Sequence, residues 1–391
     1  MQTLAVAGAL CVLVIVLRLT KEIAFSLIVS VVALGVFSSI PVSVYGHAFM
    51  VQLLDWSFWR VMITISAIYL LGDTMSKSGD SYRFVDSIRR LFPTPRVSIA
   101  LLPALIGLLP MPGGAMFSAP MVKSISQADE TIDAEDGVSI NYWFRHSMEF
   151  FWPLYPAIII VAGMADVALG TIVALMLPVG LVAIISAYFM MIRSWPRMKL
   201  SKGVLKDLLV NGWPLFATIV FVLIGASGWI VVSVISVVYV MTKKNRLDIL
   251  VKSVKYKMLL LLGAVFFFKA FVEEAEIAAG MSSELMLWSI PPVLVIMLLP
   301  ALMGFMTGIT QAAVGMSFPL IMSLQNGLTP LSIAILGYIF AITGVYISPV
   351  HLCVALTTQY FDVSYARFLK KILVPLLFSI ATGIVIFVIL R

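Results

Sequence analysis

The chain has 391 residues, of which 61% are hydrophobic and 12% are charged. Soluble globular domains carry about 25% charged residues, so this composition excludes an ordinary soluble protein and indicates a membrane protein. The net charge of +7 comes from basic residues in short loops, which orient membrane proteins and give no reason to expect a nucleic-acid partner. Cys11 and Cys353 lie in apolar segments without metal-binding spacing, and His351 beside Cys353 is weak evidence for a metal. We therefore expect no metal and no cofactor.

Apolar segments long enough to cross a bilayer as helices recur along the whole chain. The predicted spans are 2–18, 22–40, 54–72, 141–164, 167–191, 207–224, 226–242, 257–272, 329–349 and 372–390. Two further apolar segments, 97–122 and 286–322, are interrupted by Pro, Gly and Thr. The charges Arg18 and Lys21 follow the first span, so we expect it to stay in the mature protein as a span and not to be cleaved as a signal peptide.

Three connecting segments have patterns of their own. Residues 41–54 contain no Lys or Arg and are expected to form a loop. Residues 79–92 combine an apolar and a basic face, which predicts a surface amphipathic helix next to the first interrupted segment. Residues 124–136 are acidic and are expected to form a solvated loop.

The distribution of charge predicts the topology. The basic loops all fall on one side of the membrane if the N-terminus is outside, and the other side carries Glu273, Glu274, Glu276 and Glu284. The positive-inside rule then places both termini outside. This arrangement requires 97–122 and 286–322 each to enter and leave by the same face, as re-entrant hairpins.

A sequence repeat supports this topology. Leu101-Leu-Pro-Ala-Leu-Ile-Gly107 recurs as Leu298-Leu-Pro-Ala-Leu-Met-Gly304, and both copies lie in the interrupted segments. The predicted fold is therefore an all-α polytopic membrane protein, an inverted repeat of two five-span halves with one hairpin each, or about 10 transmembrane helices and two hairpins. The first repeat covers 1–193, a cytoplasmic linker covers 194–206, and the second repeat covers 207–391.

The hairpin turns are candidate anion sites. Pro110 and Pro112 end the first half-helix of the first hairpin, and the second hairpin turns at Thr307-Gly-Ile-Thr-Gln311. The half-helix after each turn presents free N–H groups and the positive end of its dipole. Thr310 is predicted as the N-cap of its half-helix. The predicted substrate-binding residues of the two turns are Pro112, Gly113, Gly114, Ala115, Thr307, Gly308, Thr310 and Gln311. Ordinary kinks in continuous spans are the alternative.

The span after each hairpin is predicted to break at proline. Pro153 and Pro156 interrupt the first of these spans, and Pro349 interrupts the second. Carbonyl groups freed at such breaks can coordinate Na⁺, and Tyr155 and Ser348 can add side-chain oxygens.

Arg145, His146 and Glu149 are ionisable residues within one predicted span. Such residues are costly in a membrane and are functional candidates by default. Arg145 is assigned to anion binding together with His351, and Glu149 or His146 to carrying a proton. The alternative is that Arg145 and Glu149, four residues apart on a helix, only neutralise each other.

Three motifs together resemble an uncharacterised prokaryotic integral-membrane family related to the ion transporter superfamily, which includes gluconate permeases and citrate and dicarboxylate carriers. They are Pro110-Met-Pro-Gly-Gly-Ala115, Glu149-Phe-Phe-Trp-Pro-Leu-Tyr-Pro156 and Ser348-Pro-Val-His-Leu-Cys353. The resemblance implies a homodimer in which spans 1–3 and 6–8 form a scaffold. It also implies that the hairpins and the spans after them form a transport domain that moves as an elevator.

These observations predict a secondary transporter of the bacterial or archaeal inner membrane, with both termini outside. Its expected substrate is a small organic anion, such as a carboxylate, coupled to H⁺ or Na⁺ as a symporter. The alternative is a cation/proton antiporter that uses Glu149. An enzyme is not expected, because the chain has no nucleophile motif and no His-Glu-x-x-His sequence. Besides the substrate, the lipid bilayer and a second copy of the chain are the expected partners.

Overall fold

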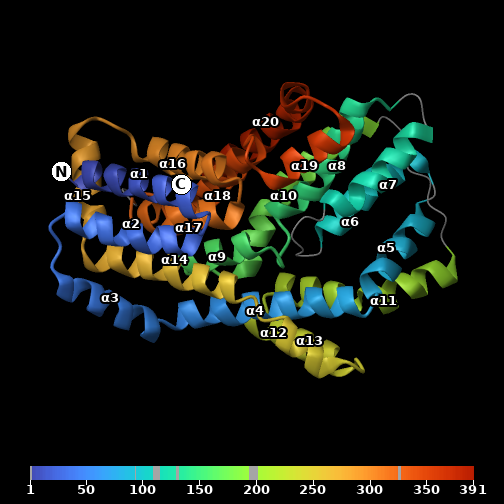
Figure 1. Ribbon diagram of the computed structural model, residues 1–391, viewed down its shortest axis with the longest axis horizontal. Helices are drawn as coiled ribbons and strands as arrows, with labels where there is room; N and C mark the ends of the chain where they lie inside the picture. Colours follow the sequence, from blue (N-terminus) through green and yellow to red (C-terminus); the bar gives the residue numbers. More distant parts are fainter. Residues whose placement is uncertain (1, 93, 109–114, 129–131, 193–200, 325–326) are drawn as a thin grey trace.

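The computed structural model describes residues 2–92, 94–108, 115–128, 132–192, 201–324 and 327–391, and within these ranges the regular structure is entirely helical (Figure 1). The helices up to residue 192 are α1 (Gln2–Thr20), α2 (Ile23–Phe37), α3 (Val42–Leu54), α4 (Trp56–Lys77), α5 (Asp80–Leu91), α6 (Pro95–Gly107), α7 (Ala115–Ala128), α8 (Ala134–His146), a 3-10 turn (Ser147–Phe150), α9 (Pro156–Met164), α10 (Leu169–Ala187) and a π-helical turn (Tyr188–Ile192).

The helices after residue 200 are α11 (Lys202–Leu223), α12 (Gly228–Met241), α13 (Arg246–Lys252), α14 (Tyr256–Glu274), α15 (Ile277–Leu287), α16 (Pro292–Thr307), α17 (Thr310–Ile321), α18 (Pro330–Tyr346), α19 (Leu352–Phe361) and α20 (Tyr365–Leu390). The predicted linker 194–206 lies largely outside the described residues, and its last part is the first turn of α11. The short helices α13 and α15 were not predicted.

Among the described residues, four helices are long and apolar enough to cross a bilayer: Gln2–Thr20, Leu169–Ile192, Gly203–Leu223 and Tyr365–Leu390. A fifth span is present if α3 and α4, which meet at an angle of 61°, are counted together. Several other predicted spans are shorter apolar helices, such as α2, α12 and α18. The prediction of a polytopic all-α membrane protein is therefore confirmed at the level of an all-helical chain with several apolar helices.

Two connecting segments differ from the prediction. Residues 42–54, expected as a loop, form α3, and the chain turns into α4 where the Asp55 carboxylate accepts a hydrogen bond of 2.8 Å from the Ser57 N–H. Residues 124–136 are mostly helical, because α7 continues to Ala128 and α8 begins at Ala134. Acidic residues are favourable in the first turn of a helix, which accounts for Glu135 and Asp136 at the start of α8.

The predicted amphipathic helix is α5, but its apolar face packs on protein. Phe84 is buried against Phe216 of α11, with their rings 5.9 Å apart, whereas Tyr82 is exposed. Asp80 at its first turn accepts hydrogen bonds from Arg83 on α5 and from Tyr239 and Lys243 at the end of α12. These contacts attach α5 to both α11 and α12.

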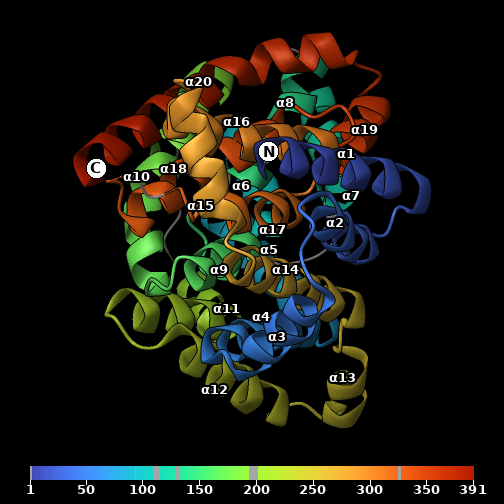
Figure 2. The same cartoon turned by 90° about the vertical axis from the view of Figure 1, so that its left-hand side faces the viewer.

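The helices pack in two sets, and each set contains two similar groups. In one group of the first set, α2 packs against α1 and α14, and α15 lies against α1. In the matching group, α12 packs against α11 and α4, and α5 lies against α11. The second set pairs α6 with α7 and α8, and α16 with α17 and α18. α10 packs along α20 and joins the two halves of this second set (Figures 1 and 2).

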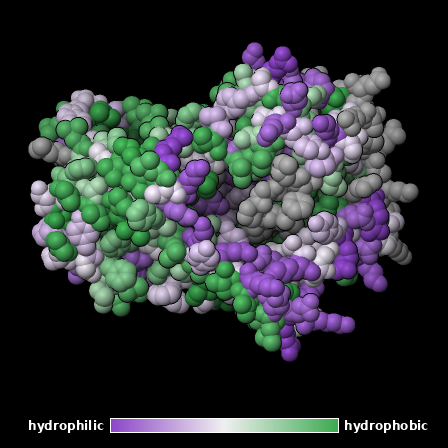
Figure 3. Space-filling view, viewed as in Figure 1, coloured by the Kyte–Doolittle hydropathy of each residue, from purple (hydrophilic) through white to green (hydrophobic). Residues whose placement is uncertain are grey.

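The helices differ in how much of their surface is buried by other helices. Every residue of α17 from Ala312 to Ile321 is buried, so this short helix is surrounded by protein. By contrast, α1 and α20 expose large apolar side chains, among them Leu19 and Ile389. In Figure 3, hydrophobic residues cover the half of the visible face over α1, α2 and α14, and hydrophilic residues gather over α5, α11 and α13.

The glycine that ends each copy of the sequence repeat lies against the backbone of a neighbouring helix. A Cβ atom on Gly107 would collide with the Arg145 carbonyl of α8, and one on Gly304 would collide with the Ala341 carbonyl of α18. Glycine therefore brings α6 onto α8 and α16 onto α18, because only a residue without Cβ permits this approach. In both copies these contacts fix the helix that carries the repeated motif.

Candidate functional site

The predicted span 141–164 is interrupted where proline predicts. The chain leaves α8 through the 3-10 turn, and Pro153 lies in the non-helical segment before α9. Pro156 is the first residue of α9, where its missing N–H costs no helical hydrogen bond. The interruption is therefore a real break and not a bend in one long helix.

The corresponding span in the second half is interrupted in the same way. α18 ends before Pro349 and α19 begins after it, with Pro349 in the turn between them. Ser348 is fully buried, and its hydroxyl donates a hydrogen bond of 2.6 Å to the Phe305 carbonyl near the end of α16. In the first half, the Trp152 indole N–H donates at 3.0 Å to the Leu108 carbonyl just after α6. The first break is thus tied to the end of α6, and the second to the end of α16.

Glu149 is the buried carboxylate at the first break. Its Oε1 accepts a hydrogen bond of 2.8 Å from the Tyr155 hydroxyl, and its Oε2 accepts one of 2.9 Å from the Thr310 hydroxyl. The Tyr338 hydroxyl donates to the Glu149 backbone carbonyl at 2.6 Å. Only 4% of Glu149 is exposed, so the site contains a desolvated carboxyl group held by two neutral hydroxyl donors, one just before α9 and one at the start of α17.

The turn between α16 and α17 is well defined. Gly308 has φ +63°, a left-handed conformation that ends α16, and a Cβ atom there would collide with the His351 backbone. α17 begins two residues later. The N-cap position is Ile309, so the prediction that Thr310 is the N-cap is wrong. Thr310 is the first helical residue, and its hydroxyl is directed to Glu149.

Two histidines from the two breaks meet in the buried interior. His146 Nε2 lies 3.2 Å from His351 Nε2 and 3.8 Å from Glu149 Oε1. The ring of His146 also stacks on Tyr142, with centroids 4.2 Å apart. The structure therefore brings together five predicted site residues: Glu149, His146, His351, Tyr155 and Thr310.

Several backbone carbonyls at the breaks already accept hydrogen bonds from side chains. The Tyr346 hydroxyl donates to the His146 carbonyl, and the Tyr365 hydroxyl donates to the Ile347 carbonyl. These tyrosines, with Tyr338, satisfy polar groups that the interruption of the helices exposes. If these carbonyls bind Na⁺ as predicted, the same oxygens have to coordinate the ion and accept the tyrosine hydrogen bonds.

Arg145 is buried in the last turn of α8, next to His146. Its predicted i,i+4 relation to Glu149 does not hold as helix geometry, because the α-helix ends at His146 and Glu149 belongs to the 3-10 turn. Thr307 donates within its own helix, to the Met303 carbonyl at 2.7 Å. Gln311 is half-buried in the first turn of α17.

Part of the first predicted anion site falls outside the described residues. This applies to Pro112, Gly113 and Gly114, while Ala115 is the first residue of α7. The contribution of this turn therefore stays a prediction.

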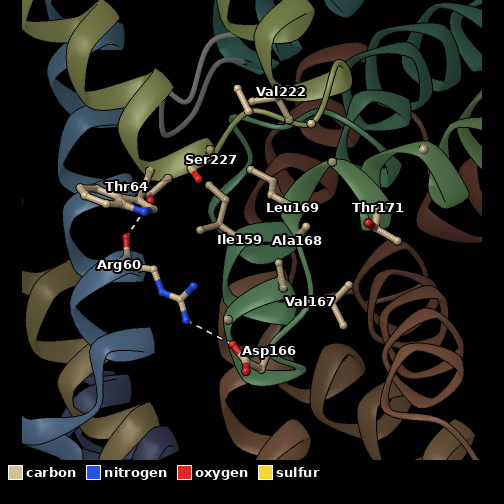
Figure 4. Close-up of a pocket in the computed structure, with 18 of the residues that line it drawn as sticks. Arg60, Thr64, Ile159, Asp166, Val167, Ala168, Leu169, Thr171, Val222 and Ser227 are labelled. Carbon is tan, nitrogen blue, oxygen red and sulfur yellow. Dashed lines mark hydrogen bonds and ion pairs between the residues drawn. The ribbon is translucent and has the colours of Figure 1, made fainter.

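A separate cavity of about 750 Å³ lies between α4, the α9–α10 connection and the α11–α12 connection (Figure 4). Arg60 on α4 reaches across it to Asp166, with 3.2 Å between Nη2 and Oδ1. Most of its other lining residues are apolar, such as Ile159, Val222 and Leu169, and none belongs to the predicted site. The cavity lies between α4, α11 and α12 on one side and α9 and α10 on the other.

Comparison with known proteins places the chain in a family. A family model described as "Protein of unknown function (DUF401)" matches residues 3–390. The chain belongs to the DUF401 family. No curated protein matches it.

The DUF401 chain also resembles a solved structure, the crystal structure of the YdaH transporter from Alcanivorax borkumensis. The TM-score is 0.59 at 13% sequence identity, and the match covers 83% of this chain and 84% of that chain. At this identity the likeness concerns the fold: the DUF401 chain has the fold of a membrane transporter.

Sequence reasoning missed Tyr338, Tyr346 and Trp152, which are ordinary aromatic residues of apolar segments and have no spacing that marks them. Their role depends on carbonyls that the two breaks expose, which only the three-dimensional structure identifies. A search for buried aromatic hydroxyl and indole donors opposite predicted helix breaks would have found them.

Proposed function

We propose that this protein is a secondary active transporter that moves a small organic anion of the carboxylate class across the inner membrane of a bacterial or archaeal cell. The observation that carries this proposal is the buried Glu149 carboxyl, held by Tyr155 and by Thr310 where α17 begins. This position joins the turn of the second hairpin to the break after the first. Interrupted helices that meet inside a membrane protein are typical of transporter binding sites.

The start of α17 is suited to a carboxylate. The first N–H groups of a helix have no helical acceptor and carry the positive end of the helix dipole. Thr310 already donates to the Glu149 carboxyl here, so the protein holds its own carboxyl group where a substrate carboxylate would be stabilised. Arg145, His351 and the first turn of α7 are the further proposed substrate contacts.

This arrangement favours H⁺ over Na⁺ as the coupling ion. Two carboxylates cannot both be ionised in one desolvated site without a large electrostatic cost. Anion binding therefore requires Glu149 to take up a proton, and release of the anion lets that proton leave. His146, 3.8 Å from Glu149, is placed to pass it on. For Na⁺, the remaining ligands are the carbonyls at the breaks, with Tyr155 and Ser348, whose oxygens already form hydrogen bonds.

The reciprocal helix packing supports an inverted repeat and an elevator mechanism. The packing of α2 on α14 corresponds to the packing of α12 on α4. The Trp152 and Ser348 side chains donate to the carbonyls of Leu108 and Phe305, which occupy equivalent positions in the two halves. In this proposal α1–α4 and α11–α14 form a scaffold that also mediates a homodimer. The hairpins, α8–α10 and α18–α20 move past it, and the cavity at Arg60 and Asp166 lies along the boundary.

The test is a thermal-unfolding screen of the purified protein with mono-, di- and tricarboxylates, inorganic anions and Na⁺ at two pH values. A ligand present at 100 times its Kd adds roughly 2.7 kcal/mol to the stability of the folded state. We expect one class of carboxylates to stabilise the protein, and more strongly at the lower pH. If no anion stabilises the protein and Na⁺ or pH does, the anion carrier is wrong.

The second candidate function is a cation/proton antiporter, favoured by the same buried Glu149. The variant Glu149→Gln separates the two functions, because it resembles the protonated carboxyl. An anion carrier with this change keeps anion binding and loses its pH dependence. An antiporter loses the exchange of cations for protons altogether.

A further inference from the structure

The two histidines at the centre of the site are held in a defined orientation. His146 Nδ1 lies 2.7 Å from the Tyr142 carbonyl, and His351 Nδ1 lies 2.6 Å from the Gly308 carbonyl. A carbonyl oxygen only accepts hydrogen bonds, so each Nδ1 carries a proton and donates it. In the neutral rings, both Nε2 atoms then have a free lone pair.

These two lone pairs face each other. The Nε2 atoms are 3.2 Å apart, and both rings are buried, with 1% of His146 and 8% of His351 exposed. Two acceptors at this distance repel unless a positive species lies between them. The geometry therefore calls for either a shared proton or a metal ion.

A third ligand decides between these possibilities. Cys353 follows His351 by two residues, and its Sγ lies within 4.8 Å of one ring nitrogen of each histidine. Only 7% of Cys353 is exposed. In the part of the chain that the structure describes, these residues form the one group of three potential His, Cys or carboxylate ligands close enough to share an ion. A shared proton makes no use of a sulfur ligand, whereas a metal does.

The distance between the two nitrogens fits zinc. Two Zn–N bonds of about 2.0–2.1 Å at a tetrahedral angle separate their nitrogens by about 3.3–3.4 Å, close to the observed 3.2 Å. Ligating histidines usually donate their other N–H to a carbonyl or carboxylate, as both rings do here. Zn²⁺ binds both His nitrogen and Cys sulfur, and three protein ligands leave its fourth position open.

We propose that His146, His351 and Cys353 form a buried binding site for Zn²⁺ that links the breaks of the two halves. On binding, the Cys353 thiol releases its proton to the solvent and coordinates the ion as thiolate. The thiolate supplies one negative charge against the two positive charges of the ion, and Glu149 supplies the second when it is ionised. The zinc site shares His146 and His351 with the proposed transport site, and bound Zn²⁺ occupies the His146 Nε2 that would otherwise pass on the Glu149 proton. Zinc binding itself is measured without transport.

Zinc binding to the purified full-length protein tests this proposal, with Co²⁺ as a spectroscopic substitute. The wild-type chain should bind one Zn²⁺, and its Co²⁺ complex should show a thiolate-to-metal charge-transfer band. Loss of a partner that only orients a ligand costs roughly 10–100-fold in metal affinity, so His351→Ala and Cys353→Ser should each raise the Kd at least about 10-fold. Cys353→Ser should also abolish the charge-transfer band.

The chain supplies matched controls. It contains three histidines and two cysteines, so His47→Ala and Cys11→Ser each remove the remaining residue of the same type. Both controls should bind Zn²⁺ as the wild type does. Ser is close to Cys in size, and size-exclusion chromatography with thermal unfolding shows whether each variant is folded. The proposal is wrong if the wild type binds no Zn²⁺, or if folded Cys353→Ser and His351→Ala proteins bind it with unchanged Kd.

Discussion

Asp80 anchors the amphipathic helix α5 to α12, and replacing it with Asn tests this attachment. Burial alone would raise the pKa of the Asp80 carboxyl, but hydrogen bonds from Lys243, Tyr239 and Arg83 outweigh it and lower the pKa from 3.8 to about 2. The distance from Lys243 Nζ to Asp80 Oδ2 is 2.5 Å. The ionised carboxylate is therefore more stable in the folded chain than in the unfolded chain.

The size and sign of the effect follow from this pKa. A fall from 3.8 to about 2 corresponds to about 2.4 kcal/mol of folding free energy. Solvent screening of the partly exposed Arg83 and Lys243 reduces the expected value to about 1–2 kcal/mol. Because the folded pKa is the lower one, this contribution is present above pH 4 and is lost as the pH falls from 4 to 2.

Thermal unfolding of the detergent-solubilised protein measures the effect. For a chain of 391 residues, a loss of 1–2 kcal/mol corresponds to a fall in Tm of about 1–2 °C. Asp80→Asn should lower the Tm by this amount at pH 7, and the difference from wild type should disappear near pH 2. Asp86→Asn on the same helix, where Asp86 forms an exposed pair with Arg90, is the control and should change little. Equal effects of both variants, or a difference that persists at pH 2, would refute the reasoning.

Three further predictions concern the site and its support. Tyr338→Phe removes the donor to the Glu149 carbonyl, and thermal unfolding should show a loss of about 1 kcal/mol; an unchanged Tm would contradict this role. Thr310→Val keeps the side-chain shape but removes a donor to the Glu149 carboxyl, so the pH dependence of anion binding should shift, whereas an unchanged pH profile would separate Thr310 from the coupling. Gly344→Val forces the backbones of α16 and α18 apart and should destabilise the folded protein by about 1–3 kcal/mol or more. Gly263 has open space around it, so Gly263→Ala should leave the stability unchanged. Similar Tm values for the two variants would contradict the packing of α16 on α18.

Local sequence features indicated several elements that the structure brings together. The repeated Leu-Leu-Pro-Ala-Leu motif lies on α6 and α16, and its terminal glycines contact a neighbouring helix in both copies. Pro153 and Pro349 marked the breaks, because proline removes a helical hydrogen bond wherever it stands. Glu149, His146 and His351 were found because ionisable groups are rare within apolar segments.

The remaining features depend on contacts between distant segments. His146 and His351 are 205 residues apart, so no spacing rule brings their rings together. Threonine is a common N-cap residue, but the Thr310 hydroxyl donates to the buried Glu149 carboxylate, and the N-cap position is occupied by Ile309. Residues 42–54 lack the length of a span and the charge of a surface helix, and in the structure α3 packs against α14.

Transport by protein reconstituted in liposomes tests the central proposal most directly. The substrate is the carboxylate that stabilises the protein most in the thermal screen, and uptake is measured with and without an inward proton gradient in the wild type and in Glu149→Gln. The proposal predicts that the gradient accelerates uptake by the wild type, whereas Glu149→Gln exchanges the anion but does not respond to the gradient. Cation-driven proton movement without any anion, lost in Glu149→Gln, would contradict the anion carrier and establish the antiporter.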